Sequence, residues 1–117
     1  MNKLSSKQII SLVKRGEIAV FTPIEKEHET LTLIARENKI LLVKECSIVI
    51  DSEIENLKEP IVRELSKGQA LDFCEENSNS LVNITSEDSI ILYVDEIIDE
   101  VLSKETADED YELRLAS

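Results

Sequence analysis

The spacing of hydrophobic and polar positions indicates a helix at the start of the chain. Apolar side chains from Ile9 to Val13 form one face at helical spacing, and basic residues follow them at Lys14 and Arg15. Ser5 and Gln8 have the spacing of a capping box, and Gly16 suits the position after a helix end. We therefore predict an N-terminal helix within residues 1–16.

The pattern changes in residues 17–94, where short apolar runs alternate with polar turns. The runs are rich in Ile, Leu and Val and cover 17–22, 30–35, 40–43, 47–50, 61–65, 70–73, 81–84 and 90–94. Such short β-rich runs at regular spacing predict antiparallel strands. Residues 36–39 fit a hairpin turn, the charged stretch 51–59 a loop, and residues 66–69 a turn. The predicted fold is mainly β, a jelly roll or β-sandwich with N- and C-terminal helices.

Helical spacing returns in residues 95–117, which form the last part of a predicted single domain of 117 residues. Asp95 can cap a helix whose inner face carries Ile97, Ile98, Val101 and Leu102. Acids are concentrated here, which suggests two interpretations: a solvated helix face, or a surface that binds a protein partner. For the second, we take Asp95, Glu96, Asp99 and Glu100 as candidate partner-binding residues.

The charge of the chain narrows the range of partners. Thirteen basic and twenty-five acidic residues give a net charge of −12. Nucleic acids and anionic membranes would repel such a chain, because both are bound mainly through Lys and Arg. Met1–Ser6 lacks the apolar core of a signal peptide, and Cys46 and Cys74 do not form a CxxC pair. These features predict a cytoplasmic protein that binds neither nucleic acid nor membrane.

Candidate catalytic groups are scarce. His28 is the only histidine and lies among Glu25, Glu27 and Glu29, where we expect it to face solvent. A solvent-facing histidine is a poor base for a Ser or Cys nucleophile, and one histidine with two scattered cysteines does not make a zinc ligand set. With two glycines, the phosphate-binding glycine motifs are absent, as is a calcium loop. We predict a protein without catalytic residues, cofactor or metal.

Two passages resemble the cyclic-nucleotide-binding domains. Glu64–Glu75 is similar to their L-x-x-G-x-x-F-G-E passage, and Ser80–Val94 is similar to the strand, acidic turn and strand that follow it. Upstream, Glu29–Lys44 resembles the family's first hairpin, with Asn38 where a glycine is usual. The resemblance implies a β-roll and a ligand pocket. Its residues here would be Phe73, Cys74, Glu75, Asn79 and Ser80.

The residues that hold the cyclic phosphate in that family are missing from this chain. Cys74 replaces the glycine before Glu75, and no arginine lies between Arg63 and Arg114. An arginine would supply charge-assisted hydrogen bonds to the phosphate, and without it Glu75 and Glu76 repel the anion. We therefore expect a degenerate pocket that does not bind cAMP or cGMP.

The sequence favours a non-catalytic regulatory or binding module that contacts a protein partner. Two alternatives stay open: an acidic inhibitor or nucleic-acid mimic of a mobile element, and a cupin-like protein that binds a small molecule. Whether the chain forms a homodimer also stays open, since nothing in the sequence tests the oligomeric state.

Overall fold

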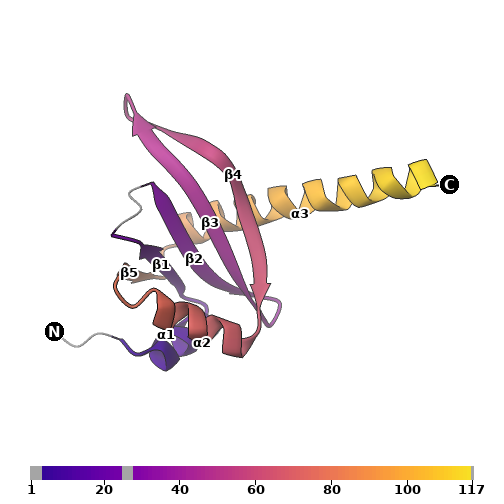
Figure 1. Ribbon diagram of the computed structural model, residues 1–117. Coiled ribbons are helices and arrows are strands. Elements are labelled where there is room, and N and C mark those ends of the chain that lie inside the picture. The colour runs from indigo at the N-terminus through magenta and orange to yellow at the C-terminus, as the bar shows by residue number, and fades with distance from the viewer. Residues whose placement is uncertain (1–3, 25–27, 117) are drawn as a thin grey trace.

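The structure is a computed structural model that describes residues 4–24 and 28–116. Within these ranges the side chains are described for residues 4–24, 28–47, 51–53 and 58–104. The described chain forms three helices and five strands (Figure 1). In chain order these are α1 (Ser6–Lys14), β1 (Ile18–Thr22), β2 (Glu29–Arg36), β3 (Lys39–Ile50), β4 (Glu53–Leu65), α2 (Lys67–Glu76), β5 (Leu81–Thr85) and α3 (Asp88–Ala116).

The strands form one antiparallel sheet in the order β4-β3-β2-β1-β5. The predicted antiparallel β architecture with a helix at each end is thus confirmed. The contents of helix and strand are more even than the predicted mainly β fold, because helices and strands take up similar lengths of the chain. A jelly roll or sandwich packs two sheets together, whereas here helices cover the single sheet (Figure 1).

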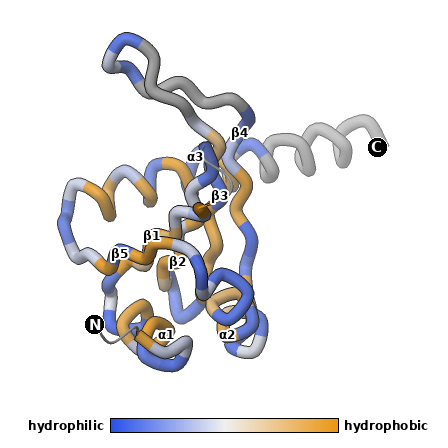
Figure 2. The backbone as a smooth tube through the Cα atoms, turned by 60° about the vertical axis from the view of Figure 1, so that its left-hand side comes forward, coloured by the Kyte–Doolittle hydropathy of each residue, from blue (hydrophilic) through white to orange (hydrophobic). Residues whose placement is uncertain are grey.

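Helices α1 and α2 cover one face of the sheet. Alternate residues of β1 and β2 point to this face, and among them Phe21 and Leu33 are fully buried. Ile9, Ile10 and Val13 of α1 pack against them, as the helical spacing predicts, and α2 adds Ala70 and Cys74. Figure 2 shows α1 and α2 side by side next to the sheet. This core fixes α2 beside α1 and the sheet.

Helix α3 packs across the opposite face. Its inward residues Val94 and Ile98 are buried against Ile18, Ile34 and Val43 of the first three strands. Past the sheet, α3 continues beyond β4 (Figure 1). The helix starts at Asp88, so the predicted boundary at residue 95 is wrong by about two turns.

Two predicted strands are helical. Residues 70–73 lie in α2, and residues 90–94 form the first turns of α3. Ser66 and Gln69, predicted as a turn, form the capping box of α2: the Gln69 N–H donates to Ser66 Oγ and the Ser66 N–H donates to Gln69 Oε1. The same arrangement of Ser5 and Gln8 starts α1, which confirms the prediction for the N-terminal helix.

The predicted break after Val43 and the predicted loop at 51–59 are also wrong. Lys44–Cys46 continues β3, with register shifts against β4 around Cys46, and most of 51–59 belongs to β4. A polar strand is stable here because β4 is an edge of the sheet. The predicted turn between Arg36 and Lys39 is confirmed. Among the described residues, no helix combines the length and apolar character needed to cross a bilayer.

Candidate functional site

An open cavity of about 620 Å³ lies where α2 ends and β5 begins, next to the start of α1. We call it the α2–β5 cavity. Its described lining comes from three places in the sequence: Leu4, Ser5 and Ser6 before and in α1, Phe21 in β1, and Cys74, Glu75, Asn77, Ser78, Ser80, Leu81 and Val82 around the turn after α2. The volume is in the range of sites that hold a small molecule or a side chain of a partner.

The rear of the cavity is held by aromatic packing. The rings of Phe21 and Phe73 meet edge to face with their centroids 5.1 Å apart. This geometry places the positive edge of one ring on the negative face of the other. The contact joins α2 to β1 and fixes the helix turn that carries Cys74 and Glu75.

The turn after α2 is fixed by hydrogen bonds from its own residues. The side-chain amide of Asn77 donates to the Phe73 carbonyl at 2.9 Å, and the Ser80 N–H donates to the Asn77 carbonyl at 3.0 Å. The Phe73 carbonyl also accepts the backbone N–H of Asn77 at 3.0 Å, so side chain and backbone together hold the end of α2. The chain then enters β5, where Val82 lies opposite Phe21.

The charge of the cavity is negative. Glu75 is the only charged residue in its described lining, and it is exposed. A cyclic phosphate would therefore meet a carboxylate and no cation. The remaining wall is mixed, with apolar surface from Leu4, Leu81 and Val82 and hydroxyls from serines.

Cys74 lies in the cavity wall but is only 3% exposed. Burial, together with the charge of Glu75, raises the pKa of its thiol to about 11. The thiol therefore keeps its proton near neutral pH, whereas a nucleophilic cysteine needs the thiolate. Cys74 is therefore not an activated nucleophile.

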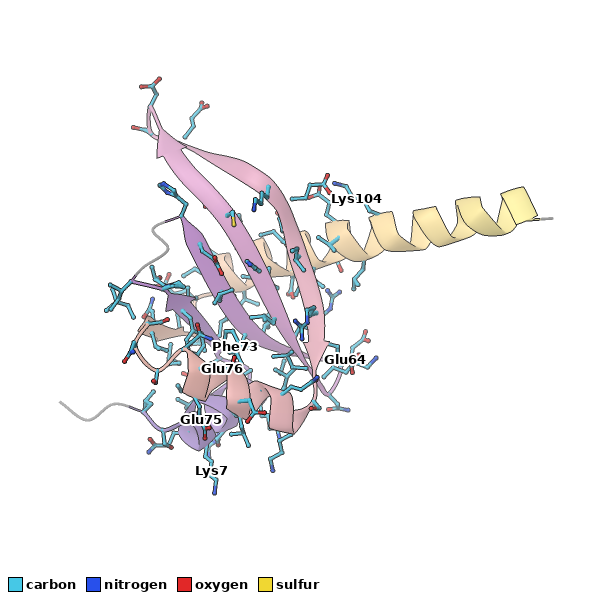
Figure 3. The ribbon with its side chains drawn as sticks, viewed as in Figure 1. Lys7, Glu64, Phe73, Glu75, Glu76 and Lys104 are labelled. Carbon is cyan, nitrogen blue, oxygen red and sulfur yellow. The ribbon has the colours of Figure 1, made fainter. Side chains whose placement is uncertain are left out.

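The structure brings together three of the five predicted pocket residues, Cys74, Glu75 and Ser80. Phe73 stands behind them in contact with Phe21, and Asn79 is exposed and outside the described lining. Figure 3 shows Phe73 and Glu75 on α2. Sequence reasoning missed Leu4 and Phe21, because their proximity depends on α1 packing beside α2 and on β5 pairing with β1. It also missed Leu81 and Val82, which directly follow Ser80 and were assigned only to an apolar strand.

The predicted acidic surface on α3 is partly occupied by contacts within the chain. Arg36 Nη2 donates to Asp99 Oδ1 at 2.6 Å, and Glu100 pairs with Lys104 at 3.6 Å. Asp95 is half-buried and its charge helps to raise the pKa of Arg36, after the larger effect of Asp99. Glu96 is exposed. These four acids thus differ in how accessible they are to a partner.

The other residues that could take part in catalysis or metal binding do not gather at one site. His28 is exposed, as predicted. Within the described part of the chain, no three His, Cys, Asp or Glu side chains are grouped to hold a metal ion. Comparison of the chain with protein-family models, with curated proteins and with solved structures finds no match.

Proposed function

We propose that the protein is a non-catalytic binding module, and that its α2–β5 cavity receives an apolar side chain of a partner protein next to a lysine or arginine. The observation that carries this proposal is the composition of the cavity. Its described wall exposes apolar surface and a single charge, the carboxylate of Glu75. An apolar anchor with a cationic neighbour complements that wall, and the net charge of −12 attracts basic partners from a distance.

The resemblance to cyclic-nucleotide-binding domains fits this proposal in a restricted sense. It supports a pocket near Glu75 but without cAMP or cGMP as ligand, because the lining supplies no cation for the phosphate. The proposal includes a cytoplasmic location. It is supported by the state of Cys46 and Cys74, which are both free thiols.

The test uses two fluorescein-labelled peptides that share a central leucine and differ in their ends. One carries lysine at both ends, the other glutamate. Binding is measured by fluorescence anisotropy, with cyclic AMP as a third probe. We expect saturable binding of the lysine peptide, and none of the glutamate peptide or of cyclic AMP.

A pair of matched variants locates the binding. Glu75→Lys should lower the affinity for the lysine peptide about fivefold, because it replaces an attraction at an exposed position by a repulsion. Glu76→Lys makes the same change at the next exposed position, outside the described lining, and should change the affinity less than about twofold. Equal effects of the two variants, or micromolar affinity for cyclic AMP, would contradict the proposal.

A further inference from the structure

Strand β5 is an open edge of the sheet. It pairs with β1 along its whole length, from Leu81 opposite Thr22 to Thr85 opposite Ile18, and no other described strand lies beside it. Its outer side therefore presents backbone N–H and C=O groups to solvent. Leu81 is 68% exposed and Val82 38% exposed. Such an edge is a template for pairing with another strand unless charge, proline or a bulge protects it.

The other edge of the sheet has this protection. Strand β4 carries Glu59, Pro60, Arg63 and Glu64, and its register with β3 shifts near Cys46. In contrast, the chain from Asn77 to Ser86 has no ionisable side chain, although 32% of all residues are charged. The edge that lacks protection is thus β5 alone.

We propose that β5 pairs with β5 of a second copy of this chain, antiparallel and centred on Asn83, so that the two sheets join into one. A two-fold interface must be complementary to itself. In this register Val82 lies opposite Ile84 of the other copy, and Asn83 opposite its own counterpart. Leu81 and Thr85 pair at the ends. Apolar residues therefore meet on the face of α1 and α2, and polar residues lie at the centre of the other face.

Charge favours a second copy over a basic partner at this edge. Two chains of net charge −12 repel each other, and they approach best where neither carries charge. A basic strand would be recognised by acids along β5, and Leu81–Thr85 supplies none. The proposal goes beyond the proposed function, because it depends on the backbone edge of β5 and not on the carboxylate of Glu75. The two surfaces adjoin, since Leu81 and Val82 of β5 also line the α2–β5 cavity.

The test is the mass of the full chain in solution by sedimentation equilibrium. We expect a dimer of two 13.3 kDa chains at micromolar concentration. Raising NaCl from about 20 mM to about 500 mM should tighten the dimer, because salt screens the repulsion between the acidic copies. A native chain that stays monomeric up to millimolar concentration at both salt levels would overturn the proposal.

Charge variants test the register. Asn83 is exposed, so Asn83→Lys and Asn83→Glu leave the monomer core untouched but place like charges opposite each other at the centre of the dimer. Each variant alone should be monomeric, and an equimolar mixture should restore the dimer. Ser11→Lys and Ser11→Glu, which change charge at an exposed position of α1, should leave it intact. Dimers of native strength in both Asn83 variants would refute this register.

A disulfide gives an independent measurement that does not rely on weakened pairing. Opposite residues of antiparallel strands have Cα atoms about 4.5–5.5 Å apart, within the range that a disulfide spans. In a Cys46→Ser background, Asn83→Cys should cross-link to a dimer on mild oxidation, and Ser11→Cys should not. Equal cross-linking at both positions would count against the proposed pairing.

Discussion

The hydroxyl of Tyr93 on α3 donates a 2.8 Å hydrogen bond to Oε2 of Glu45 on β3. Glu45 is 6% exposed, and its carboxylate lies beneath the helix that covers this face of the sheet. A buried carboxylate is costly unless it accepts hydrogen bonds. The bond therefore does two things: it stabilises the carboxylate and it sets the position of α3 on the sheet.

Tyr93→Phe should lower the free energy of unfolding by about 1–3 kcal/mol, because the ring stays and Glu45 loses its donor. Urea denaturation with a constant slope measures the change. Leu92→Ala, at the neighbouring exposed position, is the control and should cost no more than about 0.5 kcal/mol. Equal losses in the two variants would mean that the hydrogen bond contributes nothing.

Alkaline pH should destabilise the protein in two steps. Burial, aided by Glu75, raises the pKa of Cys74 from 9.0 to about 11. Burial and the hydrogen bond to Glu45 raise the pKa of Tyr93 from 10.0 to about 12. Both groups hold their protons more tightly in the folded chain than in the unfolded chain. Their contribution to stability is thus complete below the ordinary pKa and is lost as pH rises, from 9.0 to about 11 for Cys74 and from 10.0 to about 12 for Tyr93.

The measurement is the urea midpoint as a function of pH, from about pH 8 upward. Cys74→Ala should flatten the first part of the decline, and Leu92→Ala, which removes no ionisable group, is the control that should keep its shape. Tyr93→Phe should flatten the later part. A midpoint that falls equally steeply in the native chain and in both test variants would show that other groups cause the alkaline transition.

The errors of sequence reasoning have a physical origin in the length of the apolar runs. Ala70–Phe73 and Ile90–Val94 are too short and continuous to tell a strand from a buried helix. Other signals in the sequence could have decided both. Ser66 and Gln69 have the same capping spacing as Ser5 and Gln8, and positions 90, 94, 97 and 101 continue one helix face.

The site was accessible to sequence reasoning only within one continuous stretch of the chain. Cys74 and Glu75 lie at the end of α2, Ser80 follows the turn after it, and the resemblance pointed to that stretch. Leu4 and Phe21 reach the same cavity through the packing of α1 and the pairing of β1 with β5. Such contacts depend on the arrangement of whole elements, which no local pattern encodes.

The hairpin between β2 and β3 should gain stability from a better turn sequence. Glu37 and Asn38 both have positive φ, 54° and 65°, in a two-residue turn that favours Asn-Gly. Glutamate is strained in this region by roughly 1–2 kcal/mol. The double change Glu37→Asn and Asn38→Gly should therefore raise the free energy of unfolding by about 1 kcal/mol, measured by urea denaturation. Asn38→Val, which puts a β-branched residue at positive φ, should lower it. Stabilisation by Asn38→Val would refute the left-handed turn.

The two glycines should respond to the same substitution with opposite signs. Gly16 follows α1 with a φ of 105°, where an added Cβ meets no atom but the backbone itself is unfavourable for other residues. Gly16→Ala should therefore lower the free energy of unfolding by about 1–2 kcal/mol.

Gly68 lies in the first turn of α2 with open space around its Cβ position and no such backbone restriction. Gly68→Ala should raise the free energy by about 0.5–1 kcal/mol, since alanine favours the helix and restricts the unfolded chain. Each variant is the control for the other, because a steric clash of the added Cβ would destabilise both. If Gly68→Ala destabilises, residues 66–69 behave as a turn and not as the start of α2.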